Sequence, residues 1–167
     1  MKCTQIKKKN IALTVRVPAS KSISNRLLIL QKTSGIPFEI NNLSHADDTV
    51  LLNDLLQKAE NHHSDKPLVL HCRNCGTAYR FLCAYLACKQ GLWILEGSER
   101  MQQRPIQALA DALVDAGAEI DYLKNRGFPP LQIKGKLLHA DFREIDSRQS
   151  SQYVSAVAMI LPLINRE

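Results

Sequence analysis

Four short segments of the chain carry polar and basic residues at the point where an apolar helical pattern begins. They cover residues 20–26, 74–80, 100–106 and 146–152. A helix start leaves backbone N–H groups unpaired and carries a partial positive charge, so hydroxyl groups and cations gathered there can hold a phosphate or a carboxylate. One such start alone is equally typical of an ordinary capped helix, but the repetition favours a fold built of capped helices that bind anions.

Particular residues in these segments have the chemistry of anion ligands. Lys21 lies beside the first helix cap, and Ser22 and Arg26 are four residues apart, so they share one helix face. Gly76 lets a ligand approach the backbone of the second segment closely. Arg104 lies just before a proline at the predicted first position of another helix. The polar groups of the last segment could face the same ligand.

The periodicity of apolar residues predicts alternating helices and strands. Helices are expected near 21–33, 46–60, 76–90, 105–116 and 150–163, and strands near 11–17, 37–43, 67–72, 92–96, 118–123, 131–135 and 141–146. The order approximates strand-helix-strand-helix-strand-strand units that repeat with variation, which indicates an internal structural repeat. The predicted class is therefore α/β.

Two helix ends are predicted from local signals. Ser44 is expected to cap the second helix, with Asp47 and Asp48 in its first turn, where the helix dipole favours carboxylates. Both aspartates are interpreted as structural, although paired carboxylates can also serve acid/base catalysis. Gly117 is expected to end the fourth helix.

Composition narrows the function classes. The chain has 167 residues, 45% of them hydrophobic, which is enough for one real core or two small ones. Its net charge of +6 suits either nucleic acid or small anions, but aromatic residues make up only 5% and do not alternate with the basic ones, which argues against nucleic-acid binding. The sequence holds no apolar stretch of about 18 residues and no apolar secretory signal, so no membrane association and a cytoplasmic location are expected.

The five cysteines are expected to be reduced thiols, because their number is odd and no export signal is present. Cys72 and Cys75 have the spacing of metal ligands, with histidines upstream. Cys83 and Cys88 lie in an apolar helical pattern, where thiols behave as small hydrophobic groups. A zinc site would need four ligands, so no metal is predicted.

The polar segments resemble those of one family, the 3-phosphoshikimate 1-carboxyvinyltransferases, also called EPSP synthases. Residues 20–26, 74–80, 100–106 and 150–152 are similar to the family's motifs, in the family's order and close to its spacing, and the resemblance runs from about Val15 to the last residue. It implies an inside-out α/β lobe with helices inside and sheets outside, and substrates bound between two such lobes.

The resemblance also implies a domain organisation. Residues 1–15 would be a crossover strand that belongs to the other lobe, and residues 16–167 would be the N-terminal substrate-binding lobe, with two repeats and the start of a third. The chain is then expected to be a fragment that is inactive alone, with the C-terminal lobe of the same enzyme as its partner. The intact enzyme is expected to be a monomer.

The reaction that the resemblance implies is transfer of the enolpyruvyl group of phosphoenolpyruvate to the 5-hydroxyl of shikimate 3-phosphate. The products would be 5-enolpyruvylshikimate 3-phosphate and phosphate, and no cofactor is expected. Lys21 matches the lysine that reaches both substrates and is the catalytic candidate, while Gly76 and Arg104 match groups around phosphoenolpyruvate.

The other matched positions fall into two sets. The positions that match contacts to shikimate 3-phosphate are Ser22, Arg26, Ser150, Ser151 and Gln152, the last also near phosphoenolpyruvate. The positions expected to shape the glycine loop are Asn74, Thr77 and Arg80.

Departures from the family pattern bring in alternatives. Cys75 and Phe81 replace the more usual alanine and proline, so the sequence leaves substrate affinity and inhibitor sensitivity at this loop open. A short connection over 61–73 predicts a narrower outer sheet.

A UDP-N-acetylglucosamine enolpyruvyl transferase is a rival function, disfavoured because Lys21 is followed by Ser22 rather than asparagine. A noncatalytic anion-binding module is the other alternative.

Overall fold

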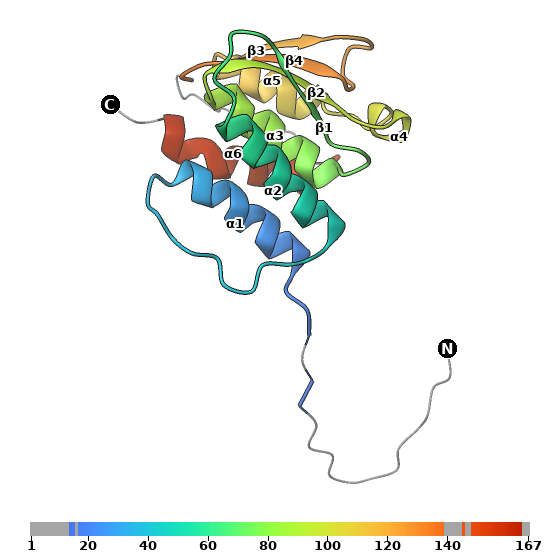
Figure 1. Cartoon of the computed structure of the whole chain (residues 1–167). Coiled ribbons are helices and arrows are strands. Elements are labelled where there is room, and N and C mark those ends of the chain that lie inside the picture. The colour runs from blue at the N-terminus through green and yellow to red at the C-terminus, as the bar shows by residue number, and fades with distance from the viewer. Residues whose placement is uncertain (1–13, 16, 139–144, 146–147, 165–167) are drawn as a thin grey trace.

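The computed structural model describes residues 14–15, 17–138, 145 and 148–164. Its helices lie on one face of a four-stranded sheet (Figure 1). The described helices are α1 (Lys21–Thr33), α2 (Asp47–Glu60), α3 (Gly76–Cys88), α4 (Glu99–Gln102), α5 (Gln107–Asp115) and α6 (Ser151–Ile164), and the strands are β1 (Leu68–His71), β2 (Gly91–Glu96), β3 (Glu119–Tyr122) and β4 (Leu131–Gly135). This arrangement confirms the predicted α/β class.

The sheet has the strand order β1-β2-β4-β3. Strand β1 is parallel to β2, with Leu70 opposite Leu95, and the other two pairs are antiparallel, with Ile133 opposite Trp93 in β2. These four side chains are fully buried. Because successive side chains of a strand point to opposite faces, their alternation with more exposed residues marks the face that packs on the helices.

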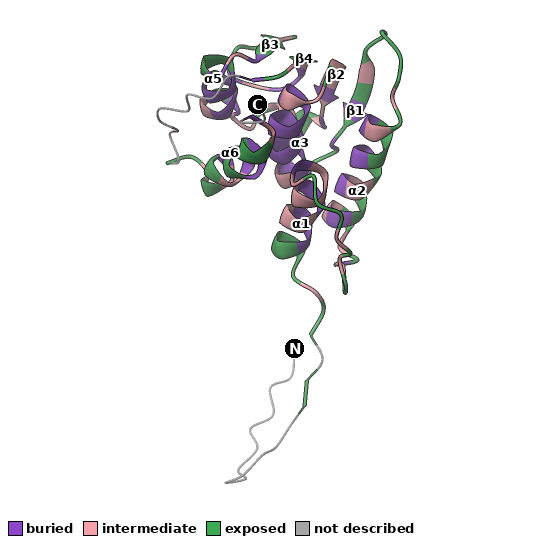
Figure 2. Ribbon diagram, turned by 90° about the vertical axis from the view of Figure 1, so that its left-hand side faces the viewer, coloured by how far each residue is buried: buried purple, intermediate pink, exposed green. Residues whose placement is uncertain are grey.

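Helix α3 lies at the centre of the core. Eleven of its residues, from Gly76 to Ala87, are buried, and it contacts α1, α2, α5, α6, β2 and β4. Figure 2 shows it as a buried helix among more exposed ones. A helix that is apolar on all sides must be buried on all sides. At its far end, a Cβ atom on Gly135 would lie only 1.7 Å from the carbonyl oxygen of Lys89, so β4 crosses the helix end in direct contact.

Two helix ends follow local signals. Ser20 caps α1, with its Oγ accepting a hydrogen bond from the N–H of Ile23 at 3.4 Å. Gly117 ends α5 as predicted: it has φ +100°, its N–H donates to the carbonyl of Val114, and the next N–H, from Ala118, reaches back to Leu113. This pair of bonds is the Schellman motif, which requires a residue in the left-handed region.

The prediction that Ser44 caps α2 is wrong. The cap residue is Ala46, without a side-chain hydrogen bond, while Ser44 is buried and its N–H donates to the Oγ of Ser24 at 3.0 Å. The Ser44 hydroxyl accepts instead from the N–H of Ala46 at 3.2 Å. Ser44 is bonded to Ser24 in α1 and therefore does not cap α2. Asp47 and Asp48 do lie in the first turn, as expected.

The strand predicted near 37–43 is also wrong. These residues form a loop with a turn, in which Asn42 has φ 60°. The side-chain amide of Gln31 donates to the carbonyl of Phe38 at 2.8 Å and holds this loop against α1. Pro37 offers no N–H for strand pairing. Residues 14, 15 and 17 are not in a strand, and the rest of the strand predicted near 11–17 lies outside the described residues.

The remaining differences are smaller. The strand predicted near 141–146 lies outside the described residues apart from Ile145, which is not in a strand. Helix α5 begins at Gln107 rather than at Pro105, and the short helix α4, capped by the Oγ of Ser98, was not predicted. Within the described part of the chain, no helix is long and apolar enough to cross a membrane.

Candidate functional site: an anion-binding surface at the helix starts

The starts of α1, α3 and α6 lie toward the same end of the helix layer (Figure 1). Arg26 joins two of these helices, because one end of its guanidinium donates to the Oγ of Ser155 in α6 at 3.1 Å. The other end donates to the carbonyl of Ser22 at 2.9 Å, and the group lies 5.6 Å from the ring centroid of Phe81. Arg26 is therefore held between α1, α3 and α6, although its partner Ser155 is 129 residues away in the chain.

Gln152 joins the start of α6 to the start of α3. Its Oε1 accepts a hydrogen bond from Nη1 of Arg80 at 3.0 Å, and its Nε2 donates to Oγ1 of Thr77 at 3.0 Å. The two bonds fix the orientation of the amide, because an arginine can only donate. Thr77 and Arg80, which the sequence interpretation assigned to shaping the loop, thus hold a predicted ligand residue in place.

Gly76 is the first residue of α3 and lies against two arginine side chains. A Cβ atom added to it would lie 2.4 Å from Nη1 of Arg104 and 2.6 Å from Nη1 of Arg80. Only glycine leaves room for both guanidinium groups at this helix start. Arg80 is 6% exposed, lies 5.4 Å from the ring centroid of Tyr153, and its buried Nε has no hydrogen-bond partner. Two cations next to the positive end of a helix dipole favour a bound anion.

A cavity of about 400 Å³ opens beside Arg104. It is lined by Asn74, Arg100, Gln103 and Arg104, so no carboxylate lines it. Its volume is in the range of small-molecule sites. Arg100 and Gln103 were not singled out as ligand residues from the sequence; their only signal was their place next to Arg104 in the third polar segment.

Lys21 is the first residue of α1 and forms an ion pair with Asp48 of α2, with Nζ 2.7 Å from Oδ2. The hydrogen bond and the negative charge of Asp48 raise the pKa of Lys21 above its ordinary value. The lysine side chain is 49% exposed, so it can still reach a ligand. The sequence predicts Asp48 as a structural residue of a helix start. Its contact with Lys21 joins residues 27 positions apart and has no local sequence signal.

The two predicted serines lie at the start of α6. Ser151 is exposed and begins the helix, and Ser150 accepts a hydrogen bond from the N–H of Gln152 at 3.2 Å. Tyr153, which the sequence interpretation did not include, donates from its hydroxyl to the carbonyl of Pro105 at 2.7 Å and so ties α6 to the segment that carries Arg104.

The structure therefore connects the four predicted segments by named contacts. Arg26 of α1 contacts Ser155 of α6, and Gln152 of the same helix contacts Arg80 of α3. Arg80 and Arg104 both lie against Gly76, which extends this series to the segment before α5. The other predicted positions, Lys21, Ser22, Asn74, Thr77, Ser150 and Ser151, lie next to members of this series or at the same helix starts.

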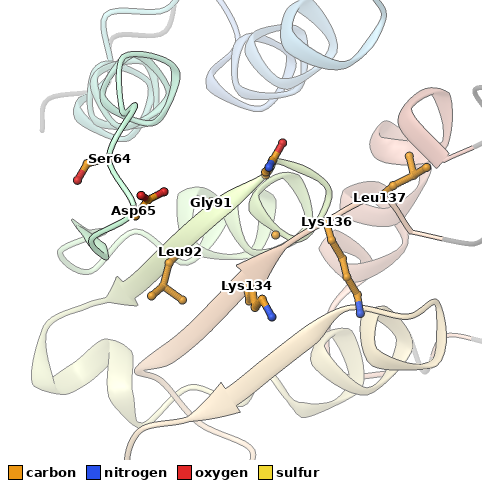
Figure 3. A pocket seen from close by; sticks show the side chains of 9 residues that line it. Ser64, Asp65, Gly91, Leu92, Lys134, Lys136 and Leu137 are labelled. Atoms are coloured by element: carbon orange, nitrogen blue, oxygen red, sulfur yellow. The ribbon is translucent and has the colours of Figure 1, made fainter.

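A larger cavity of about 550 Å³ contains none of the predicted ligand residues (Figure 3). It lies beside the first residues of β2 and the last residues of β4, next to Asp65. Its cations, Lys134 and Lys136, are already paired with Glu119, at 3.1 and 2.8 Å. No group of three metal-ligating side chains occurs among the residues that the structure describes.

Together, the fold and the site define an α/β lobe in which several helix starts present hydroxyl groups, amides and guanidinium groups on one surface. The sequence model of the EPSP synthase (3-phosphoshikimate 1-carboxyvinyltransferase) family matches residues 6–167. The chain belongs to this family.

Individual relatives agree with the family match. A 3-phosphoshikimate 1-carboxyvinyltransferase from Bacteroides fragilis (strain YCH46) is 44% identical over 92% of this chain, and one from Colwellia psychrerythraea (strain 34H) is 39% identical over 89%. The matches span 36% and 39% of those proteins. An EPSP synthase structure from Acinetobacter baumannii superposes with a TM-score of 0.69 at 20% identity, over 87% of this chain and 37% of that one, which shows the same fold.

Proposed function

We propose that this chain supplies the shikimate 3-phosphate-binding wall of an EPSP synthase, an enzyme that transfers the enolpyruvyl group of phosphoenolpyruvate to the 5-hydroxyl of shikimate 3-phosphate and releases phosphate. The observation that carries the proposal is the series of contacts from Arg26 through Ser155 and Gln152 to Arg80 and Gly76. Within this series, Arg26, Gln152 and Gly76 are the positions that match ligand contacts in the family motifs, and they come from α1, α6 and α3.

Arg26 and the start of α6 are the proposed contacts for the phosphate and ring of shikimate 3-phosphate. Ser151 is exposed at the first turn of α6, where unpaired backbone N–H groups and the helix dipole attract a phosphate. Arg26 is only partly buried, so it can contact a phosphate while it remains bonded to Ser155. Ser22 and Ser150 add hydroxyl groups beside these charges.

The start of α3 is the proposed place for phosphoenolpyruvate. Gly76 brings the backbone and two guanidinium groups within reach of one another, and Arg104 also lines the adjoining cavity. Lys21, which is paired with Asp48, is the proposed contact for both ligands. A lysine is cationic at neutral pH and Asp48 raises its pKa further, so Lys21 can offset negative charge on both substrates.

The energetics require these groups to act together. A charge-assisted hydrogen bond contributes about 1.5–3 kcal/mol and a helix start about 0.3–1 kcal/mol. A single contact therefore gives weak binding. The repulsion between two polyanionic substrates increases the binding free energy that the site must supply. Protonation of the methylene carbon and removal of the hydroxyl proton need further acid/base groups. We assign these to the part of the family's proteins that lies beyond the matched region.

The proposal is tested by calorimetric titration of the chain with shikimate 3-phosphate. Binding is expected in the millimolar range or tighter, and Arg26→Ala should weaken it about tenfold or more, because a contact of about 1.5–3 kcal/mol is lost. Arg126→Ala is the matched control, since this exposed arginine lies in the segment between β3 and β4, outside the series. Absence of binding at millimolar ligand, with the chain folded by circular dichroism, would contradict the proposal.

A further inference from the structure

Cys72 and Cys75 lie at the two ends of a tight turn that leads directly into α3. The N–H of Cys75 donates to the carbonyl of Cys72 at 2.9 Å, which closes the turn. A turn closed in this way brings its first and last Cα atoms within about 7 Å of each other. Disulfides join Cα atoms about 4.4–6.8 Å apart, so the backbone of this turn already has the separation that such a bond needs.

The two thiols belong to the same buried cluster, at the two ends of one turn. Cys72 is fully buried and Cys75 is 5% exposed. Burial raises the pKa of the Cys72 thiol, and the charges of Cys75 and Cys83 raise it further. Neither thiol serves the proposed binding chemistry, and no metal-ligating cluster includes them among the described residues.

The turn is anchored on one side and leads to the binding surface on the other. The N–H of Cys72 donates to the carbonyl of Glu96 at 2.8 Å, and the carbonyl of Arg73 accepts from the N–H of Ser98 at 2.7 Å. Cys75, in contrast, caps α3: its Sγ accepts a hydrogen bond from the N–H of Ala78 at 3.3 Å. A change at this sulfur therefore acts on the helix start that begins with Gly76.

We propose that Cys72 and Cys75 are a redox-active pair that a low-molecular-weight disulfide oxidises to an intrachain disulfide, which removes the sulfur cap of α3 and weakens anion binding there. One cysteine thiolate attacks the oxidant, releases one thiol and forms a mixed disulfide. The second thiolate then displaces the other half of the oxidant. Two S–H bonds are lost, one S–S bond forms within the chain, and the oxidant is reduced to two thiols.

The surroundings of Cys75 indicate how fast the disulfide forms and how much ligand affinity its formation removes. Burial raises the pKa of Cys75, and the carboxylate of Asp48 raises it further, so little thiolate exists at neutral pH and the reaction accelerates as pH rises. Loss of an N-cap contact changes an equilibrium constant by about two- to thirty-fold. The expected loss of phosphoenolpyruvate affinity, measured by calorimetric titration of the reduced and oxidised chains, lies in this range, and this part of the inference rests on the proposed function.

The test treats the full chain with oxidised glutathione at about pH 8, blocks the remaining thiols with iodoacetamide, and maps the cysteine-containing peptides by mass spectrometry. The expected product is a disulfide between Cys72 and Cys75, lighter by two hydrogens, which reducing agent reverses. Cys88→Ala should leave it unchanged and Cys75→Ala should abolish it. The proposal is overturned if both cysteines are recovered only in alkylated form while glutathione has oxidised other thiols. It is also overturned if Cys72 forms its disulfide with Cys83.

A second measurement does not depend on the ligand. Hydrogen exchange at the N–H of Ala78, which donates to the Cys75 sulfur, should speed up in the oxidised chain and return to its original rate after reduction. Unchanged exchange in a chain that carries the mapped disulfide would overturn the claimed effect on α3. If the reduced chain binds neither phosphoenolpyruvate nor shikimate 3-phosphate, the proposed function fails, while the peptide map and the exchange rate still decide the disulfide.

Discussion

Replacing Gly76 by alanine is expected to reduce anion binding without unfolding the chain. The new Cβ atom would lie 2.4 Å from Nη1 of Arg104 and 2.6 Å from Nη1 of Arg80, whereas ordinary contact begins at 3.4 Å. Both neighbours are the ends of flexible side chains, so they can move. Arg104 must retreat by about 1 Å and Arg80 by about 0.8 Å to restore normal contact distances.

These shifts act directly on the proposed ligand contacts. The hydrogen bond from Arg80 to Gln152, now 3.0 Å, would lengthen past the limit of about 3.5 Å and release the amide. Such a charge-assisted bond contributes about 1.5–3 kcal/mol, while alanine is favoured over glycine within a helix by about 0.8–1 kcal/mol. The free energy of unfolding should therefore change by only about 1 kcal/mol, and affinity for shikimate 3-phosphate and phosphoenolpyruvate should fall about tenfold or more.

The assay combines urea denaturation with calorimetric titration of both ligands. Gly117→Ala is the matched control, because a Cβ there meets nothing within 4 Å but the backbone has φ +100°. It should lower the free energy of unfolding by about 1–2 kcal/mol and leave affinity unchanged. A folded Gly76→Ala chain with the parent's affinity would refute the reasoning. A Gly117→Ala chain that loses affinity equally would show that stability, not local contact, controls binding.

Three further outcomes follow from individual contacts. Gly135→Ala should lower the free energy of unfolding by more than about 3 kcal/mol in urea titrations. The new Cβ would lie 1.7 Å from the backbone oxygen of Lys89, which cannot move aside. Wild-type stability of this variant would contradict the close crossing of β4 and α3. Gln152→Leu should lower the melting temperature by leaving the Arg80 head group without its acceptor, at a cost of about 1–3 kcal/mol, and adding Arg80→Leu should recover part of the loss. Burial raises the pKa of Glu60, but hydrogen bonds from Lys89 and Tyr85 outweigh it and hold the pKa below its ordinary 4.5. The stabilisation by these bonds is therefore fully present above pH 4.5 and is lost as pH falls below it. Glu60→Gln should make the free energy of unfolding less dependent on pH in this acid range, and an unchanged pH dependence would show that Glu60 does not cause it.

Local sequence patterns were sufficient where a residue's role is set by its near neighbours. The helical periodicity of 21–33 and 76–90 and the strand patterns near 67–72 and 131–135 correspond to α1, α3, β1 and β4. Gly117 could be placed because the end of a helix needs a residue in the left-handed region whatever the rest of the fold does. The polar segments at helix starts were recognisable for the same reason.

Predictions failed where a distant residue decided the outcome. Ser44 has the local signature of a helix cap, but its contact with Ser24 in α1 moved it out of that position. The loop at 37–43 has apolar residues typical of a strand, yet a hydrogen bond from Gln31 holds it against a helix. The partners of the site, such as Ser155 for Arg26, lie too far away in the chain for any local pattern to indicate them.

The burial of α3 on every side has a consequence for how this surface could adapt to a different ligand. Gly76, Thr77 and Arg80 are mounted on a helix that six neighbouring elements enclose, so a change in its tilt would disturb all of them at once. Helices α1 and α6 each have an exposed face and fewer such restraints. Evolutionary tuning of specificity should therefore accumulate on α1 and α6, around a central helix whose pose stays constant.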